Sequence, residues 1–153
     1  MTKKYEQLRM DLNTWNTVIA NLAEDGEEVE VVWMDSCGDD SELGYALCHD
    51  CEMFEYGFET ENEANDRLQE IYVMSEMFTG FILPQLDEQL EGEWLNKRQY
   101  AYLVSKSESI VKRMQQFYNY YDKNNIELEA EIELEYLDSL FSKMLRFGGL
   151  DRD

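Results

Sequence analysis

The sequence predicts an α+β fold: a helical bundle of about four helices, with a small antiparallel sheet of two or three strands inserted after the first helix. Apolar residues recur at intervals of three and four in four separate stretches, as they do along one face of a helix. Between the first two stretches lies a segment of β-branched and aromatic residues broken by glycines, which is typical of short strands and turns. With 153 residues and no linker or internal repeat, residues 1–153 are expected to form a single domain.

The first helix is predicted over residues 3–23. Its apolar positions alternate intervals of three and four, which places them on one face; they are Tyr5, Leu8, Leu12, Trp15, Ile19 and Leu22. Asp25 and Gly26 then interrupt the pattern, as expected where a helix ends.

The sheet is predicted over residues 28–58. Glu28 to Met34 is rich in β-branched residues, and Tyr45 to Cys48 is a second short apolar run, both typical of strands. Met53 to Phe58 is a third candidate. Strict alternation there would place Phe54, Tyr56 and Phe58 on one face and Glu55 and Glu59 on the other.

Two further helices are predicted over residues 61–83 and 94–121. Thr60 and Glu63 have the spacing of a capping box, in which the hydroxyl and the carboxylate each accept from a backbone amide at the helix start. Pro84 disfavours helical geometry at the residue before it, so the helix is expected to end or kink at Leu83.

The last segment permits two interpretations. Residues 126–136 alternate apolar and acidic side chains, which is a strand pattern. Glu, Leu and Ala are nevertheless strong helix formers, and a stripe at intervals of three and four continues to Gly148 and Gly149. A helix over residues 126–147 is the preferred interpretation, and a strand is the alternative.

The charge is strongly negative and concentrated. The chain has 34 acidic and 13 basic residues and a formal net charge of −21, and residues 24–93 alone hold 22 acidic residues against one base, Arg67. Such a field opposes direct binding to nucleic acid or to an anionic membrane. A content of 44% hydrophobic and 13% aromatic residues excludes a disordered acidic tail. Without an apolar run of ~18 residues or an apolar stretch at the N-terminus, the chain is expected to be soluble and cytoplasmic, in the host cytoplasm if it is phage-encoded.

The motifs do not predict an enzyme. The chain has no GxSxG, P-loop or GxGxxG sequence, and its carboxylates are too numerous for an acid–base pair to be selected. The three cysteines and the single histidine fall within a short segment, as Cys37, Cys48, His49 and Cys51. The two-residue gap between Cys48 and Cys51 resembles half of a zinc knuckle. Ordinary reduced thiols are the preferred interpretation, so no cofactor and no metal are predicted.

The leading functional hypothesis is that the acidic residues form a surface that mimics a nucleic acid. Carboxylates on one face of a strand recur at about 6.6 Å, and helical i, i+4 neighbours stand about 5–6 Å apart, distances of the order of those between backbone phosphates. We expect the partner-binding residues to be Glu27, Glu28, Glu30, Asp35, Asp39, Asp40, Glu42, Asp50, Glu52, Glu55, Glu127, Glu131 and Glu135. The predicted partner is a basic nucleic-acid-binding protein or a nuclease complex.

A small acidic protein of this kind is typical of phages and mobile elements that inhibit CRISPR or restriction nucleases, although no family motif is recognised in the chain. The alternatives are a helical adaptor or assembly protein whose acidity only maintains solubility, and a small zinc-stabilised regulator built on the cysteine and histidine cluster. The adaptor would expose an apolar patch instead of a continuous acidic surface. The sequence leaves the oligomeric state open, and a dimer is compatible with it.

Overall fold

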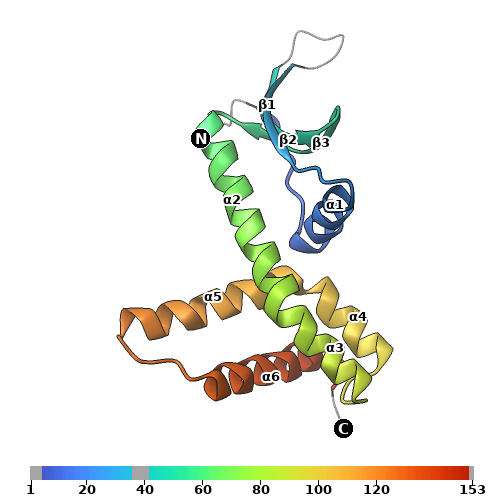
Figure 1. Cartoon of the computed structure of the whole chain (residues 1–153), viewed down its shortest axis with the longest axis vertical. Coiled ribbons are helices and arrows are strands. Elements are labelled where there is room, and N and C mark those ends of the chain that lie inside the picture. The colour runs from blue at the N-terminus through green and yellow to red at the C-terminus, as the bar shows by residue number, and fades with distance from the viewer. Residues whose placement is uncertain (1–4, 36–41, 152–153) are drawn as a thin grey trace. The chain divides into compact units, whose positions relative to one another are not determined.

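The computed structural model describes residues 5–35 and 42–151. The chain divides into two compact units, Met1–Ser75 and Glu76–Asp153, whose elements are labelled in Figure 1. The mixed α+β class predicted from the sequence is confirmed. Within the described ranges, no helix is both long and apolar enough to cross a membrane.

The first unit combines a helix, a three-stranded antiparallel sheet and most of a second helix (Figure 1). Strand order follows chain order, so two hairpins connect the strands. Its buried side chains include Leu12 and Trp15 from the first helix, Phe54 from the sheet, and Ile71 and Met74 from the second helix. The elements are α1 (Leu12–Glu24), β1 (Glu30–Asp35), β2 (Glu42–His49), β3 (Glu52–Phe58) and α2 (Glu61–Met77).

The first helix is shorter than predicted. It starts at Leu12, where the Asp11 carboxylate accepts from the Thr14 amide at 2.8 Å. The prediction of helix from residue 3 is wrong for the described residues before Asp11, because Leu8 forms an antiparallel bridge with Tyr56. The amides and carbonyls of these two residues pair in both directions at 3.2 Å. Tyr5 and Leu8 have helical spacing in the sequence, but both lie in a segment that pairs through Leu8 with the free edge of β3.

Strand β3 contains two extra residues that break its alternation. Phe54 stands between the paired positions Leu47–Glu55 and Cys48–Met53, and Gly57 stands between Tyr45–Phe58 and Ala46–Tyr56. Each is a β-bulge, which bends the strand and changes the face to which the following side chains point. Gly57 has φ +93°, a left-handed conformation that glycine adopts without steric cost.

The predicted start of α2 is confirmed, but the chain does not leave helical structure at Leu83. Thr60 Oγ1 accepts from the Glu63 amide at 3.1 Å, and the Glu63 carboxylate accepts from the Glu59 amide at 2.9 Å. At the other end a π-helical turn, Phe78–Ile82, leads directly into α3 (Leu83–Glu91). Pro84 lies in the first turn of α3, where the missing N–H of proline is tolerated. If α2, the π-helical turn and α3 are counted as one continuous helix, the described residues hold five helices and not about four.

The second unit is helical and holds α3, α4 (Lys97–Ser105), α5 (Ser107–Lys123) and α6 (Ala130–Phe147). The helix predicted over residues 94–121 is two helices separated at Lys106. At the end of α4 the Ser105 hydroxyl donates to the Tyr102 carbonyl at 2.6 Å, a local side-chain bond that competes with helix continuation. The start of α4 is fixed by a capping box between Asn96 and Gln99.

The ambiguous last segment is helical, but it begins at Ala130 and not at residue 126. Asn125 adopts φ +53° after the end of α5, and residues 126–129 are irregular. Helix α6 then packs on α5, with Tyr136 stacked on Phe117 at 4.1 Å between ring centroids. Burial and a hydrogen bond to Glu133 raise the pKa of Tyr118 on α5.

One contact in this unit predicts a measurable pH effect. The Tyr100 hydroxyl donates to the Asp87 carboxylate at 2.5 Å; this hydrogen bond, with burial and the charge of Asp87, raises the pKa of Tyr100 to about 12. The ordinary value is 10.0, so between these pH values the folded state keeps a proton that the unfolded state loses. The free energy of unfolding therefore decreases as pH rises from 10 to 12.

The Asp87→Ala variant should return the Tyr100 pKa toward its ordinary value, as followed by phenolate absorbance, and should remove this part of the pH dependence. Glu91→Ala, a substitution on the same helix, is the control and should leave the titration unchanged. An unaltered phenolate titration in Asp87→Ala would show that the hydrogen bond does not set this pKa.

Candidate partner-binding surface

Five of the predicted carboxylates lie at one end of the sheet. The antiparallel register pairs Glu30 with Cys48 and His49 with Glu52, so the start of β1, the end of β2 and the start of β3 meet there. All five residues are exposed. We name them the sheet-end carboxylates: Glu27, Glu28, Glu30, Asp50 and Glu52.

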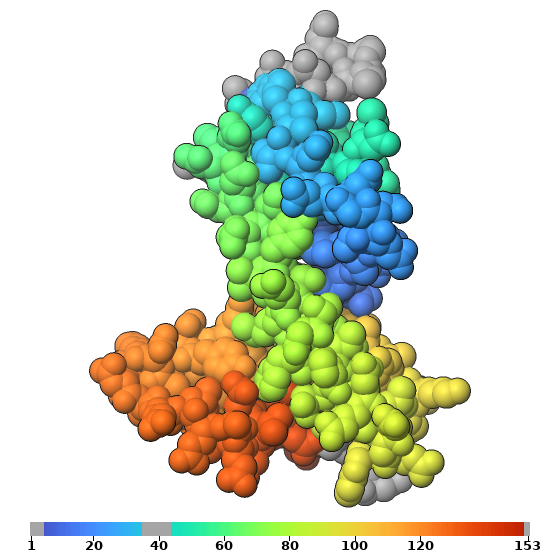
Figure 2. Space-filling model, viewed as in Figure 1, coloured from blue at the N-terminus to red at the C-terminus, as the bar shows by residue number. Residues whose placement is uncertain are grey.

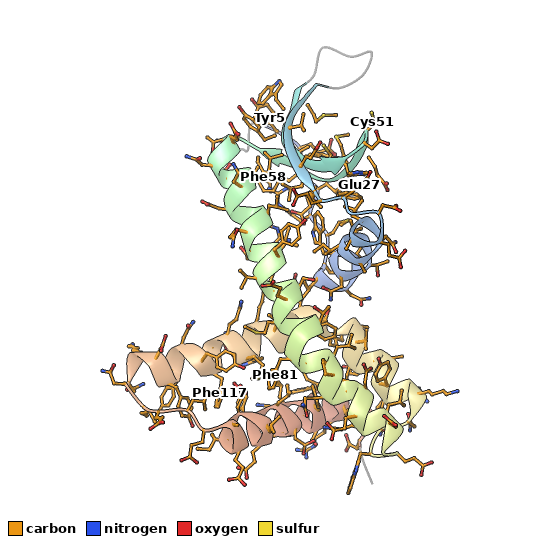
Figure 3. The ribbon with its side chains drawn as sticks, viewed as in Figure 1. Tyr5, Glu27, Cys51, Phe58, Phe81 and Phe117 are labelled. Carbon is orange, nitrogen blue, oxygen red and sulfur yellow. The ribbon has the colours of Figure 1, made fainter. Side chains whose placement is uncertain are left out.

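The figures show how this end is built. Glu27 and Cys51 lie at one end of the sheet, whereas Tyr5 and Phe58 lie beside the start of α2 (Figure 3). In the space-filling view, the turn between β2 and β3 and the segment before β1 form neighbouring parts of the surface (Figure 2). Carboxylates that are separate in the sequence therefore share one end of the unit.

The turn between β2 and β3 has a defined backbone. Its two central residues, Asp50 and Cys51, have φ +46° and +73°. Positive φ at both positions is the signature of a type I′ turn, whose twist matches that of the flanking strands. The turn places both side chains in solvent, and the short connection limits the conformations of the two strand ends.

The histidine is the one basic group that the structure places beside these carboxylates within the described residues. His49 Nε2 lies 2.5 Å from Glu27 Oε2. Glu28, Glu30, Asp50 and Glu52 have no ion pair with any described residue. The sheet end therefore carries a dense negative charge.

Glu55, also predicted to contact a partner, is fully buried, so that prediction is wrong. Its Oε2 accepts from the Trp15 indole at 2.6 Å and from the Met10 amide at 3.0 Å. Arg67 binds both of its oxygens, each at 2.9 Å. The β-bulge at Phe54 breaks the alternation that would have placed Glu55 on the outer face.

Glu55 also determines where the arginines of the first unit lie. Arg67 is held by the bidentate pair and reaches Glu70 at 3.2 Å. Arg9 Nε lies 4.0 Å from Glu55 Oε1, and its guanidinium stacks on the Phe58 ring at 3.9 Å. Both arginines in the described part of this unit are therefore directed toward Glu55 and away from the sheet-end carboxylates.

The remaining predicted residues are not among the sheet-end carboxylates. Asp35 pairs with Glu42 at the opposite end of the sheet, and Asp39 and Asp40 lie outside the described residues. Glu131 and Glu135 are exposed one turn apart on α6, whereas Glu127 lies in the irregular segment before it. All three belong to the second unit, and because Glu127 precedes α6, only Glu131 and Glu135 share that helix.

One acidic group was missed by the sequence analysis. Glu63, Asp66 and Glu70 are exposed on α2, and intervals of three and four place them on one side of the helix. That spacing is visible in the sequence and would have identified them. The Glu63 carboxylate accepts from the Glu59 amide at the helix start, and Glu70 forms an ion pair with Arg67. Two of the three carboxylates therefore already have partners within the unit.

The cysteines and the histidine have different surroundings. Cys48 is buried and Cys51 is exposed, while His49 contacts Glu27. Burial, followed by the charges of Glu30 and Cys51, raises the pKa of the Cys48 thiol. Cys37 lies outside the described residues. Across residues 5–35 and 42–151, no three metal-ligating side chains are grouped closely enough to hold a metal ion.

Comparison with known proteins does not identify a family. No family model, curated protein or solved structure matches the chain. The inference of function therefore depends on the exposed carboxylates and on the ion pairs described above.

Proposed function

We propose that this protein is a nucleic-acid-mimicking inhibitor or regulator, and that its sheet-end carboxylates occupy the Lys/Arg-lined groove of a DNA- or RNA-binding enzyme. The observation that supports the proposal best is the separation of charges within the first unit. Five exposed carboxylates share one end of the sheet, while both described arginines of the unit are directed toward the buried Glu55.

The spacing of the strands suits this role. Neighbouring strands lie about 4.8 Å apart, and same-face residues on one strand recur at about 6.6 Å. Glu30 on β1 and Glu52 on β3 flank β2 and therefore stand about 10 Å apart, which is two strand spacings. Glu28 and Glu30, two residues apart along the chain, can stand about 6.6 Å apart, which is of the order of the distance between backbone phosphates.

The electrostatics favour binding over the free state. Like charges at one end of a sheet repel one another, and the repulsion is relieved when a cationic groove replaces water and counterions. Such complementarity increases the rate of association and weakens steeply as salt is added. Candidate targets are nuclease complexes of CRISPR and restriction systems, against which phages and mobile elements carry small acidic inhibitors.

The proposal is tested by competition. A labelled DNA duplex is bound to each member of a panel of purified restriction enzymes and RNA-guided nucleases, and its displacement by the protein is followed by fluorescence anisotropy at several salt concentrations. For a true target, a triple variant with Glu28→Gln, Glu30→Gln and Glu52→Gln should require about tenfold more protein for half displacement. Its dependence on salt should also be weaker.

A matched control distinguishes the effect of where the charges are removed from the effect of how many are removed. The control carries Glu76→Gln, Glu91→Gln and Asp122→Asn, three exposed residues outside the sheet end, and it changes the net charge equally. Its half-displacement concentration should change less than about twofold. Equal losses in both triple variants, or displacement that is independent of salt, would contradict recognition by the sheet end.

The adaptor alternative is favoured by one observation. Exposed apolar side chains accumulate where α5 turns into α6, namely Tyr120, Ile126, Ile132 and Leu134. A protein that assembles through this end would retain partner binding in the sheet-end variant and lose it when Ile126 and Ile132 are replaced by serine. The same panel of variants therefore distinguishes the two functions.

A further inference from the structure

A small pocket of about 130 Å³ lies within the second unit, between α5 and α6. Its lining combines two basic side chains with a hydroxyl and several apolar groups, and none of the described lining residues is acidic. Helix α5 contributes Arg113, and one side of α6 contributes Tyr136, Ser139, Leu140, Lys143 and Phe147. The pocket is therefore positively charged within a chain whose net charge is −21.

The two basic residues of the pocket have no carboxylate beside them. Neither Arg113 nor Lys143 forms an ion pair with a described residue, although the chain has 34 acidic residues. The positions three and four residues before and after each of them hold no acidic side chain. Both therefore lack the intrahelical partner that Lys112, next to Arg113, has in Glu108 at 3.5 Å.

The electrostatic setting of the second unit permits an anion to approach. This unit holds nine of the 13 basic residues and 15 of the 34 acidic ones, so its negative field is weaker than that of the first unit. Two like charges that border one pocket also repel each other, and a bound anion relieves that repulsion.

The apolar part of the pocket offers both a fixed wall and an exposed ring. Tyr136 is held against Phe117 by stacking at 4.1 Å between ring centroids, and Phe117 lies between α5 and α6 (Figure 3). Leu140, one turn farther along α6, is buried. Phe147, the last residue of α6, is 80% exposed, although phenylalanine is among the residues most often buried.

We propose that this pocket binds a phosphate monoester carried on a small aromatic group. The Arg113 guanidinium can donate two parallel hydrogen bonds to phosphate oxygens, and the Lys143 ammonium supplies a second positive charge. The Ser139 hydroxyl is a further donor. A phosphate monoester has nearly two negative charges at neutral pH, which match the two cations, whereas a carboxylate has one. The aromatic group packs against the rings of Tyr136 and Phe147.

The pocket is a second site, in a different unit from the sheet-end carboxylates. Anion binding there does not depend on the proposed function, and it is tested with a small ligand and without a target enzyme. The probe is phenyl phosphate, titrated at pH 7.5 into the ¹⁵N-labelled full chain. We expect saturable shifts of the backbone amide signals of Ser139, Lys143 and Phe147, and their absence would overturn the proposal.

Substitutions define the contribution of each charged group. Arg113→Gln and Lys143→Gln should each weaken the binding of phenyl phosphate about five-fold, as followed by the Phe147 amide signal. Lys112→Gln makes the same charge change one residue from Arg113, outside the pocket lining, and should alter the dissociation constant less than about twofold. Equal losses in Lys112→Gln and Lys143→Gln would show that only the overall charge matters and would overturn the site.

The aromatic contact has its own test. Phe147→Ala should weaken the binding of phenyl phosphate about three-fold, as followed by the Ser139 amide signal, and should leave the weaker binding of inorganic phosphate unchanged. Inorganic phosphate that binds the unaltered protein as tightly as phenyl phosphate does would overturn the assignment of an aromatic ligand.

Two further probes decide the ligand chemistry. Benzoate should bind more weakly than phenyl phosphate, because it has one negative charge, and equal binding would overturn the preference for a phosphate monoester. Acetyl-Gly-phosphotyrosine-Gly-amide presents the same aryl phosphate on a peptide. Tighter binding of this peptide than of phenyl phosphate would support a phosphorylated protein as the source of the ligand, and weaker binding would support a small molecule.

Discussion

Replacing Glu55 with alanine is expected to lower the free energy of unfolding by about 3–5 kcal/mol. The carboxylate is fully buried, and it accepts hydrogen bonds from Trp15, Met10 and Arg67. Without it, the Arg67 guanidinium loses its bidentate partner, and the buried Trp15 indole N–H and the partly buried Met10 amide lose their acceptor. Breaking one side of a buried pair costs far more than an exposed pair would contribute.

Urea unfolding followed by circular dichroism and tryptophan fluorescence measures this effect. Glu52→Ala, on the same strand but exposed, is the matched control and should change stability by less than about 0.5 kcal/mol. A double variant, Glu55→Leu with Arg67→Leu, should recover part of the loss because it removes the Arg67 guanidinium together with its buried partner. If Glu55→Ala is as mild as Glu52→Ala, the buried ion pair does not stabilise the unit.

Gly57→Ala is expected to destabilise the protein by about 2–5 kcal/mol, from left-handed strain and steric overlap together. Gly57 has φ +93°, and a Cβ atom there would lie 2.3 Å from the Glu6 carbonyl oxygen and 2.9 Å from Gln7 Cα. Both are backbone atoms, so a rotamer change cannot relieve the overlap. The segment that pairs with β3 through Leu8 would have to move away.

Hydrogen exchange locates this change. The amides of Leu8 and Tyr56, which pair across the bridge at 3.2 Å, should lose protection in Gly57→Ala. Gly26→Ala is the control, because Gly26 also has positive φ but has open space around it, so it tests the conformational strain alone. Equal destabilisation by the two substitutions would mean that the close approach of residues 6 and 7 to residue 57 does not require a glycine at position 57.

The sequence alone predicted the elements whose signals are local. The hydroxyl and carboxylate of Thr60 and Glu63 identified the start of α2, since both groups act within one turn of the chain. The β-branched segments identified the sheet, and the helical stripe through Leu137 and Phe141 correctly favoured a helix for the last segment. Local propensity and periodicity determine such elements wherever tertiary contacts do not oppose them.

Only the tertiary structure decided which carboxylates are buried and which are brought together at the end of the sheet. The bulge at Phe54 moved Glu55 from the predicted outer face into contact with Arg67. Pairing with Tyr56 made Leu8 part of a sheet edge and not of a helix. The register brought the five sheet-end carboxylates together and left Asp35 and Glu42 at the far end. These outcomes depend on partners more than 40 positions away or on other strands, and a period of two or 3.6 residues contains no information about them.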